Sequence, residues 1–204
     1  MKIIEPYVEI LTPIDQDAIL KHLEACGRTC YKSEGKIAPG SAEKFVRMLI
    51  RNGHESVLEH CSITVRFVTD RGVSHELVRH RLASYSQEST RYCNYSGEIT
   101  VIRPPFFDLE NGKYKLWKNL CEECEEAYQA LIAAGSAPQE ARAVLPTSLK
   151  TEVVMTANLR EWRTVLRQRT SPAAHPQIRQ VMQLLLDEFH ARLPVLFGDI
   201  GGEA

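Results

Sequence analysis

The segment from Arg79 to Tyr92 carries the side chains best suited to chemistry on a phosphorylated ligand. It reads Arg-His-Arg-Leu-Ala-Ser-Tyr-Ser-Gln-Glu-Ser-Thr-Arg-Tyr, so three arginines and a histidine lie within fourteen residues. Arginine suits phosphate because its planar guanidinium donates hydrogen bonds in pairs and stays charged at any working pH. The segment therefore predicts an anion-binding site rather than a stretch of core.

The arginines of this segment leave two interpretations open. On a helix, Arg79 and Arg81 would point about 200° apart, which implies two ligands or two subunits. Ser89, Thr90 and Arg91 follow in a predicted loop, where hydroxyls and free backbone N–H groups bind a phosphate that the arginine neutralises. Alternatively, the first two arginines are solvated surface residues and the later three residues form a polar turn.

A second basic region lies later in the chain. Glu161 is the only acid between Asn158 and Arg169. The sequence predicts a local positive field there that attracts anions. In the alternative interpretation, Asn158 only caps a helix, and the basic residues form its solvated face. These residues are Arg160, Arg163 and Arg167.

Two histidines and two cysteines suggest a metal site, but their spacing argues against one. His54 and His60 are six residues apart, which is about 240° around a helix, so one helical face cannot present both to an ion. Cys121 and Cys124 fall on the apolar stripe of a predicted long helix, where packing in the core is expected. We therefore expect no metal, and we expect reduced thiols in a chain of this size.

The composition limits the class of protein. The chain has 204 residues with 25 basic and 26 acidic side chains, a formal net charge of -1. This length supports one core, so we expect a single domain spanning residues 1–204. The neutral total argues against a surface that coats nucleic acid. No signal peptide or membrane-spanning run is found, and a cytoplasmic protein is expected.

The pattern of apolar residues predicts an α+β fold with a mixed sheet flanked by helices. The helix that starts at Asp70 is expected to carry the Arg-His-Arg triplet and to bury Leu82. Strands are expected at residues 2–11 with a kink at Pro6, 62–68, 91–95, 98–103 and 151–156. Further helices are expected at 15–26 ending at Gly27, from a cap at Ser41 to Asn52-Gly53, at 112–134, from a capping box of Ser136 and Gln139 to about 146, from a start at Asn158, and at 176–192.

Several motifs resemble those of the flavin-dependent thymidylate synthases, the ThyX family. Arg79 to Ser89 matches the family's RHR-x7-S signature, and S-x-R-Y follows in register. His54 to His60, preceded by glycine, resembles its GHE-x4-H element. Glu140 to Pro146 resembles its E-x-A-R-x-x-L-P motif, and Asn158 to Arg160 resembles its N-x-R motif.

The resemblance implies a reaction, cofactors and an assembly. dUMP would be methylated to dTMP with 5,10-methylenetetrahydrofolate as carbon donor and reduced FAD as hydride source, and NADPH would restore the flavin. No Pro-Cys dipeptide is present, so an enzyme thiol would not be the nucleophile. The family also implies a homotetramer whose active sites lie where subunits meet.

The resemblance also implies residue roles. Arg169 would be catalytic, because a cation held against the uracil ring stabilises the negative charge that develops there. Glu76 stands where glutamine is frequent in the family, and Thr164 where asparagine can occur. The residues expected at FAD are His54, Ser56, Arg79, His80, Arg81, Asn158, Leu159, Arg160 and Thr164. Those expected at dUMP are Glu76, Leu77, Val78, Arg79, Gln87, Glu88, Ser89, Thr90, Arg91, Arg142 and Arg169.

Two other classes of protein stay open at this point. The arginine clusters would also suit an RNA- or nucleotide-binding module without catalysis, although no recognised module pattern is present. A metal-dependent hydrolase is the third alternative, and the histidine spacing disfavours it.

Overall fold

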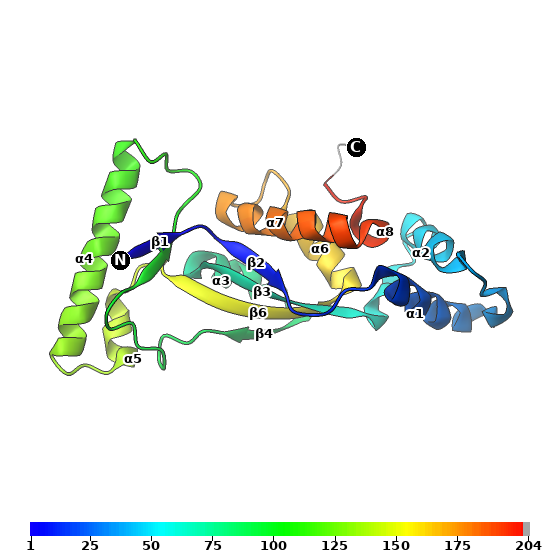
Figure 1. Cartoon of the computed structure of the whole chain (residues 1–204), viewed down its shortest axis with the longest axis horizontal. Helices are drawn as coiled ribbons and strands as arrows, with labels where there is room; N and C mark the ends of the chain where they lie inside the picture. The colour runs from blue at the N-terminus through cyan, green and yellow to red at the C-terminus, as the bar shows by residue number, and fades with distance from the viewer. Residues whose placement is uncertain (202–204) are drawn as a thin grey trace.

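An antiparallel sheet of four strands, in the order β2-β3-β6-β4, runs through the middle of the computed structural model, which describes residues 1–201 (Figure 1). Along β6, Thr151, Val153, Met155 and Ala157 are buried while the residues between them are partly exposed. One face of the sheet therefore packs on the core and the other faces outward. The strands are β2 (Tyr7–Ile10), β3 (Ser62–Asp70), β6 (Lys150–Asn158) and β4 (Ala83–Gln87).

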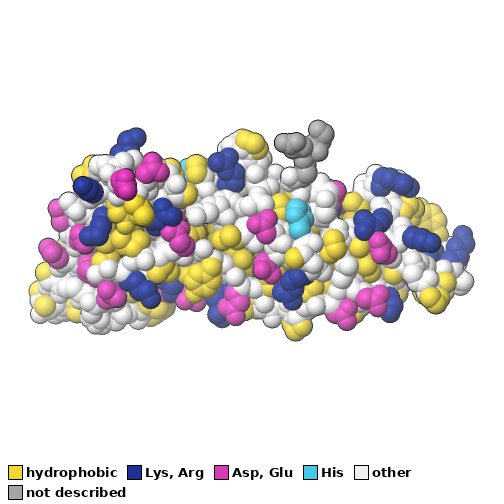
Figure 2. Space-filling view, turned by 45° about the horizontal axis from the view of Figure 1, so that its top comes forward, with side chains coloured by type: hydrophobic (Ala, Val, Ile, Leu, Met, Phe, Trp, Pro, Cys, Tyr) yellow, Lys and Arg dark blue, Asp and Glu magenta, His cyan; other side chains and the backbone are white. Residues whose placement is uncertain are grey.

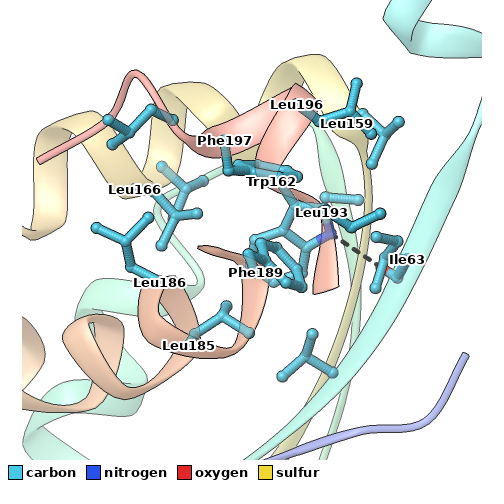
Figure 3. Close-up of a cluster of buried hydrophobic side chains, with 14 of the residues drawn as sticks. Ile63, Leu159, Trp162, Leu166, Leu185, Leu186, Phe189, Leu193, Leu196 and Phe197 are labelled. Carbon is cyan, nitrogen blue, oxygen red and sulfur yellow. Dashed lines mark hydrogen bonds between the residues drawn. The ribbon is translucent and has the colours of Figure 1, made fainter. Parts of the chain in front are cut away.

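Helices pack over the inner face of this sheet. Trp162 on α6 has no exposed surface, and its ring lies against Phe189 of α7. Its indole N–H donates to the carbonyl of Ile63 on β3 over 3.0 Å (Figure 3). This buried aromatic anchor fixes α6 against the sheet, so the ends of α6 are held in place for the site. The helices of this layer are α3 (Arg71–Leu77), α6 (Leu159–Arg169), α7 (Pro176–Arg192) and α8 (Pro194–Phe197).

The two ends of the elongated molecule are built differently (Figure 1). One end consists of α1 (Gln16–Arg28) and α2 (Ser41–Arg51). At the other end, α4 (Gly112–Ala133) packs beside the parallel pair β1 (Lys2–Ile4) and β5 (Thr100–Ile102). A second, smaller core lies there and is made of Ile99, Val101, Cys121 and Leu149. Short helical segments complete the chain: Thr29–Tyr31, Glu34–Lys36, Glu55–His60, α5 (Pro138–Ala141) and Arg142–Val144.

The α+β class is confirmed, and so are the elements with strong local signals. The last long helix spans residues 176–192 as predicted. Asn158 accepts a hydrogen bond from the N–H of Glu161 at the start of α6, and Asp70 accepts one from Val73 at the start of α3. Cys121 is buried in the second core as its place on the helical stripe predicts, and the six cysteines are free.

The prediction that the Arg-His-Arg triplet lies on a helix is wrong. Helix α3 ends at Leu77, and β4 begins at Ala83. The hydroxyl of Tyr85 donates to the carbonyls of Leu77 and His80. If the helix continued, backbone N–H groups of its next turn would bind these carbonyls instead. Leu82, expected in the core, is 76% exposed. The angle of about 200° between Arg79 and Arg81 therefore does not apply, because it assumed helical geometry.

Other element boundaries also differ from the predictions. Residues 91–95 form a turn and loop rather than a strand. Gly27 does not end α1, which continues to Arg28. Glycine at this position allows a close approach, since a Cβ there would lie 2.7 Å from the ring of Phe45. Ser41 does not cap α2, since its hydroxyl donates to Glu24.

The short helix α5 begins differently from the prediction. The predicted capping box is replaced by a hydrogen bond from the N–H of Ala137 to the carboxylate of Glu140, because the helix starts one residue later. Within residues 1–201, no helix combines the length and the apolar character that a membrane crossing requires.

Candidate functional site

The guanidinium of Arg169, the last residue of α6, reaches across to the end of α3. Its Nη1 donates to Oε2 of Glu76 over 2.9 Å, and its Nη2 lies 3.4 Å from the carbonyl oxygen of the same residue. Its Nε donates to Nε2 of His80 over 3.0 Å. A guanidinium has five N–H bonds, and three are used here, so two stay available to a ligand.

His80 supports this arrangement as a neutral imidazole. It is 7% exposed, and burial together with the charge of Arg169 lowers its pKa from 6.5 to about 4. Because Nε2 accepts a hydrogen bond, the ring proton lies on Nδ1, which is 3.9 Å from Oε1 of Glu161. Burial also raises the pKa of Glu161. The histidine therefore acts on Arg169 as an acceptor across the neutral pH range.

The loop after β4 brings the predicted phosphate-binding residues together. The hydroxyl of Ser89 accepts from the N–H of Arg91 over 3.3 Å, and the hydroxyl of Thr90 accepts from Nη1 of Arg142 over 3.3 Å. The guanidinium of Arg91 lies 5.0 Å from the ring centroid of Tyr92 and is exposed. Two arginines from distant segments thus flank one short turn of hydroxyl residues.

The side chains of Gln87 and Glu88 are hydrogen-bonded to other residues of the protein. The amide of Gln87 donates to Ser74 over 2.9 Å, and the carboxylate of Glu88 accepts from the hydroxyl of Tyr95 over 2.7 Å and from Lys150 over 3.1 Å. The motifs did not indicate that Lys150 contributes to the site, although its charged side chain at the start of an alternating strand could have drawn attention to it. These contacts tie the loop to β6.

Some residues expected at FAD line a cleft beside α1 and α2. The cleft has a volume of about 810 Å³, and His54, Ser56 and Arg160 are among its lining residues. Arg160 pairs with Glu59 over 2.6 Å. Glu59 lines a neighbouring hollow together with Arg81 and Asn158. The structure therefore brings His54, Ser56 and Arg160 to one cleft, and Arg81 and Asn158 to the hollow on the other side of this ion pair.

The remaining expected residues are not brought to either hollow. Leu77 and Leu159 have no exposed surface, whereas Val78 is exposed beside Arg79 at the end of α3. Thr164 is exposed, and its hydroxyl donates to the carbonyl of Arg160 within the helix.

The basic residues of α6 are paired with acids, which corrects the expectation of a local positive field; Arg160 and Arg167 are exposed, as the alternative of a solvated face predicts, but Arg163 is not. Arg163 has no exposed surface; it binds Glu55, Asp199 and the carbonyl of Leu196. Arg167 contacts the same two acids. By contrast, no ion pair with an acid of residues 1–201 is made by Arg79, Arg81, Arg91 or Arg142.

Comparisons with known proteins identify a family. The model of the family described as thymidylate synthase complementing protein, Thy1, matches residues 14–195. A flavin-dependent thymidylate synthase of Geobacter sulfurreducens is 32% identical over 182 residues, covering 85% of this chain and 78% of its own. That of Mycolicibacterium gilvum is 35% identical over 213 residues, covering 95% and 84%.

A solved structure matches the fold. The crystal structure of a UMP/dUMP methylase, PolB from Streptomyces cacaoi, bound with 5-Br dUMP, superposes with a TM-score of 0.78 at 23% identity. The match covers 97% of this chain and 96% of that one. The architecture described above is therefore the one found in that methylase.

Proposed function

Because the chain belongs to the thymidylate synthase complementing protein family, we propose that it methylates dUMP to dTMP as a flavin-dependent thymidylate synthase. The carbon donor is 5,10-methylenetetrahydrofolate, and NADPH reduces the FAD. The names of its relatives support the enzyme class and the flavin. The residue roles rest on the geometry of the site.

The main support for the proposal is that Arg169 is held in place by its neighbours and has two N–H bonds without an acceptor among residues 1–201. Methylation requires the uracil ring to become electron-rich at C5. A guanidinium fixed before the reaction stabilises this charge without reorganising. Glu76 and His80 hold the group from one side, so the free N–H bonds can face the pyrimidine edge.

The turn after β4 suits the phosphate of dUMP. Ser89 and Thr90 supply hydroxyls, and Arg91 and Arg142 supply charge that no acid of residues 1–201 neutralises. An arginine without an acid partner keeps its full attraction for a phosphate. In this proposal Gln87 and Glu88 shape the turn, and Leu77 and Val78 set the end of α3.

The cleft beside α1 and α2 fits part of FAD. Its volume of about 810 Å³ is in the range of cofactor sites, about 300–1,000 Å³. His54, Ser56 and Arg160 offer hydrogen-bonding groups at its wall, and Phe45 and Met48 offer apolar surface. Bound FAD would supply the hydride chemistry that no side chain can perform. Arg81 and Asn158 would hold the part of the cofactor that extends into the neighbouring hollow.

The proposed chemistry uses no cysteine nucleophile. Burial raises the pKa of the thiols of Cys61, Cys121 and Cys124, which keeps them protonated and unreactive. Cys30 lines the proposed FAD cleft, so its replacement by serine is the sharpest single test. Turnover should persist in that variant.

The proposal includes a cytoplasmic homotetramer with shared active sites. Hydrophobic side chains are exposed at the end of the molecule formed by α4 (Figure 2); Leu116 and Leu120 of this helix are 73% and 56% exposed. Exposed apolar side chains that are close together mark interaction surfaces. Analytical ultracentrifugation should show a tetramer, and a fully active monomer would contradict shared sites.

An absorbance spectrum of the purified protein, followed by a dUMP methylation assay, tests the central proposal. A flavin spectrum and formation of dTMP with the folate and NADPH are expected. A colourless protein that takes up no added FAD would refute it. RNA binding without turnover would favour the nucleic-acid module instead, although basic and acidic side chains are interspersed on the face seen in Figure 2.

A further inference from the structure

Glu76 contacts Arg169 in a way that fixes the direction of the guanidinium. The residue offers two acceptors, its side-chain Oε2 and its backbone carbonyl oxygen, at 2.9 and 3.4 Å. Arg169 is the last residue of α6, and Glu76 is on α3, so 93 positions of sequence separate the partners. This contact therefore joins two helices at the point where the free N–H bonds emerge.

No other charged group of residues 1–201 pairs with Arg169. His80 accepts from Nε, but it is neutral near pH 7 because its pKa is about 4. The Arg169 side chain is 15% exposed, and that of Glu76 is 32% exposed. A partly buried ion pair with good geometry holds both side chains in place more firmly than a pair on the open surface.

Glutamate at position 76 carries a negative charge that a glutamine there would not have. A carboxylate near dUMP would repel the phosphate, yet here its charge is offset by Arg169 at 2.9 Å. The carboxylate is thereby committed to the arginine rather than to the substrate.

We infer that Glu76 is a positioning residue that acts through Arg169, orienting its guanidinium toward the pyrimidine. Glu76 itself does not bind dUMP. This inference rests on the proposed function, and it replaces the direct dUMP contact expected for Glu76 from the family resemblance. Its consequence is that Glu76 contributes to the chemical step only while Arg169 is present.

A double-mutant cycle tests this dependence. Single-turnover methyl transfer is measured at saturating dUMP in the wild type, Glu76→Ala, Arg169→Ala and the double variant. Misplacing a positioned group costs about 100-fold in rate, so this loss is expected for Glu76→Ala, with flavin reduction by NADPH unchanged. In the Arg169→Ala background the same substitution should cause no further loss.

The conservative and control variants sharpen the test. Glu76→Gln keeps an oxygen acceptor and loses only the charge assistance, so a smaller loss of about tenfold is expected. Glu43→Ala removes an ion pair of similar length, 2.8 Å to Arg47, outside the site, and should leave methyl transfer unchanged. An equal loss from Glu76→Ala with and without Arg169 would mean an independent role and would overturn the inference, as would no loss at all.

A second readout separates this inference from the proposed function. NMR of the Arg169 guanidinium reports rotation about the Cζ–Nη bond, which the contact with Glu76 should slow in the wild type and release in Glu76→Ala. If the wild type fails to methylate dUMP, the proposed function fails, but this measurement still tests the inference. Unchanged rotation in Glu76→Ala would overturn it.

Discussion

The arginines of α6 and the arginines of the loops make opposite kinds of contact. Arg163 and Arg167 on α6 bind Glu55 and Asp199. Arg79, Arg81 and Arg91 on loops, and Arg142 in the short helical segment that connects α5 with β6, make no ion pair with any acid of the described chain, residues 1–201. Side chains of one type thus support the fold in one region and stay available to ligands in the other.

The difference shows why local charge density is a poor guide to an anion site. The α6 segment has the denser run of arginines, yet Glu55 and Asp199 pair with Arg163 and Arg167 of this run. Arg169 stands between the two groups, because it pairs with Glu76 and still has two unused N–H bonds. The number of arginines therefore does not identify the site, which also needs donors that no acid occupies.

Removing Arg163 should have the largest effect on stability. Arg163→Met keeps the apolar stem but leaves Glu55 and Asp199 without their buried partner, so a loss of about 3–5 kcal/mol in the free energy of unfolding is expected. Arg167→Met is the matched control, because Arg167 contacts the same acids while 47% exposed; its loss should be below about 1 kcal/mol. If urea denaturation showed equal losses for both variants, the burial of Arg163 would not make its ion pairs more important for stability than those of Arg167.

Arg169→Ala should impair methyl transfer much more than flavin reduction by NADPH. Losing one preorganised donor costs about 3–4 kcal/mol of transition-state stabilisation. Lysine should restore little, because its point charge does not reproduce the planar fork. Single-turnover kinetics at saturating dUMP separates this effect from weak binding. Near-normal methyl transfer under those conditions would remove Arg169 from the mechanism and place it with the structural arginines.

The parts of the fold that the sequence predicted well depend on local signals. Asn158 and Asp70 were recognisable as helix starts because a capping side chain binds a backbone N–H within three residues. Helix α7 was bounded by Pro176 and by the end of its apolar pattern. Ser89, Thr90 and Arg91 were expected in a loop, and the structure has a turn there.

The parts that could not be predicted depend on contacts between distant residues. The end of α3 is set by Tyr85, whose hydroxyl reaches back to Leu77, and helix periodicity alone extends through that point. The burial of Arg163 follows from Glu55, 108 positions away. Glu76 and Arg169 are 93 positions apart, so no local pattern in the sequence indicated their ion pair.

Replacing the loop arginines should weaken dUMP binding without destabilising the fold. Arg91→Gln and Arg142→Gln each remove a charged donor, worth about 1.5–3 kcal/mol when the bond is to a charged group. Isothermal titration should show the weaker affinity, with a loss that shrinks at high salt. Arg51→Gln, an exposed arginine at the end of α2, is the control. Unchanged dUMP affinity in both loop variants would mean that Arg91 and Arg142 do not bind the phosphate.

The smallest expected effect is a change in the pH dependence of stability when His80 becomes glutamine. The pKa of His80 is lowered from 6.5 to about 4, so between these values the unfolded chain binds a proton that the folded chain does not. Stability should therefore fall as pH falls from about 6.5 toward 4, by about 2 kcal/mol at pH 5 from this group. Glu161 and Asp70 have raised pKa values, and their contributions have the opposite sign.

Those two acids are present in every variant, so the comparison isolates the histidine. His80→Gln keeps an acceptor for Arg169 but has no proton to bind, and its stability should decline less than that of the wild type over this range. His75→Gln alters an exposed histidine on α3 and should follow the wild type. Parallel curves for all three proteins in urea denaturation would mean that His80 is protonated alike in the folded and unfolded chains. The neutral acceptor assigned to Arg169 would then be wrong, and Arg169 would have Glu76 as its only support.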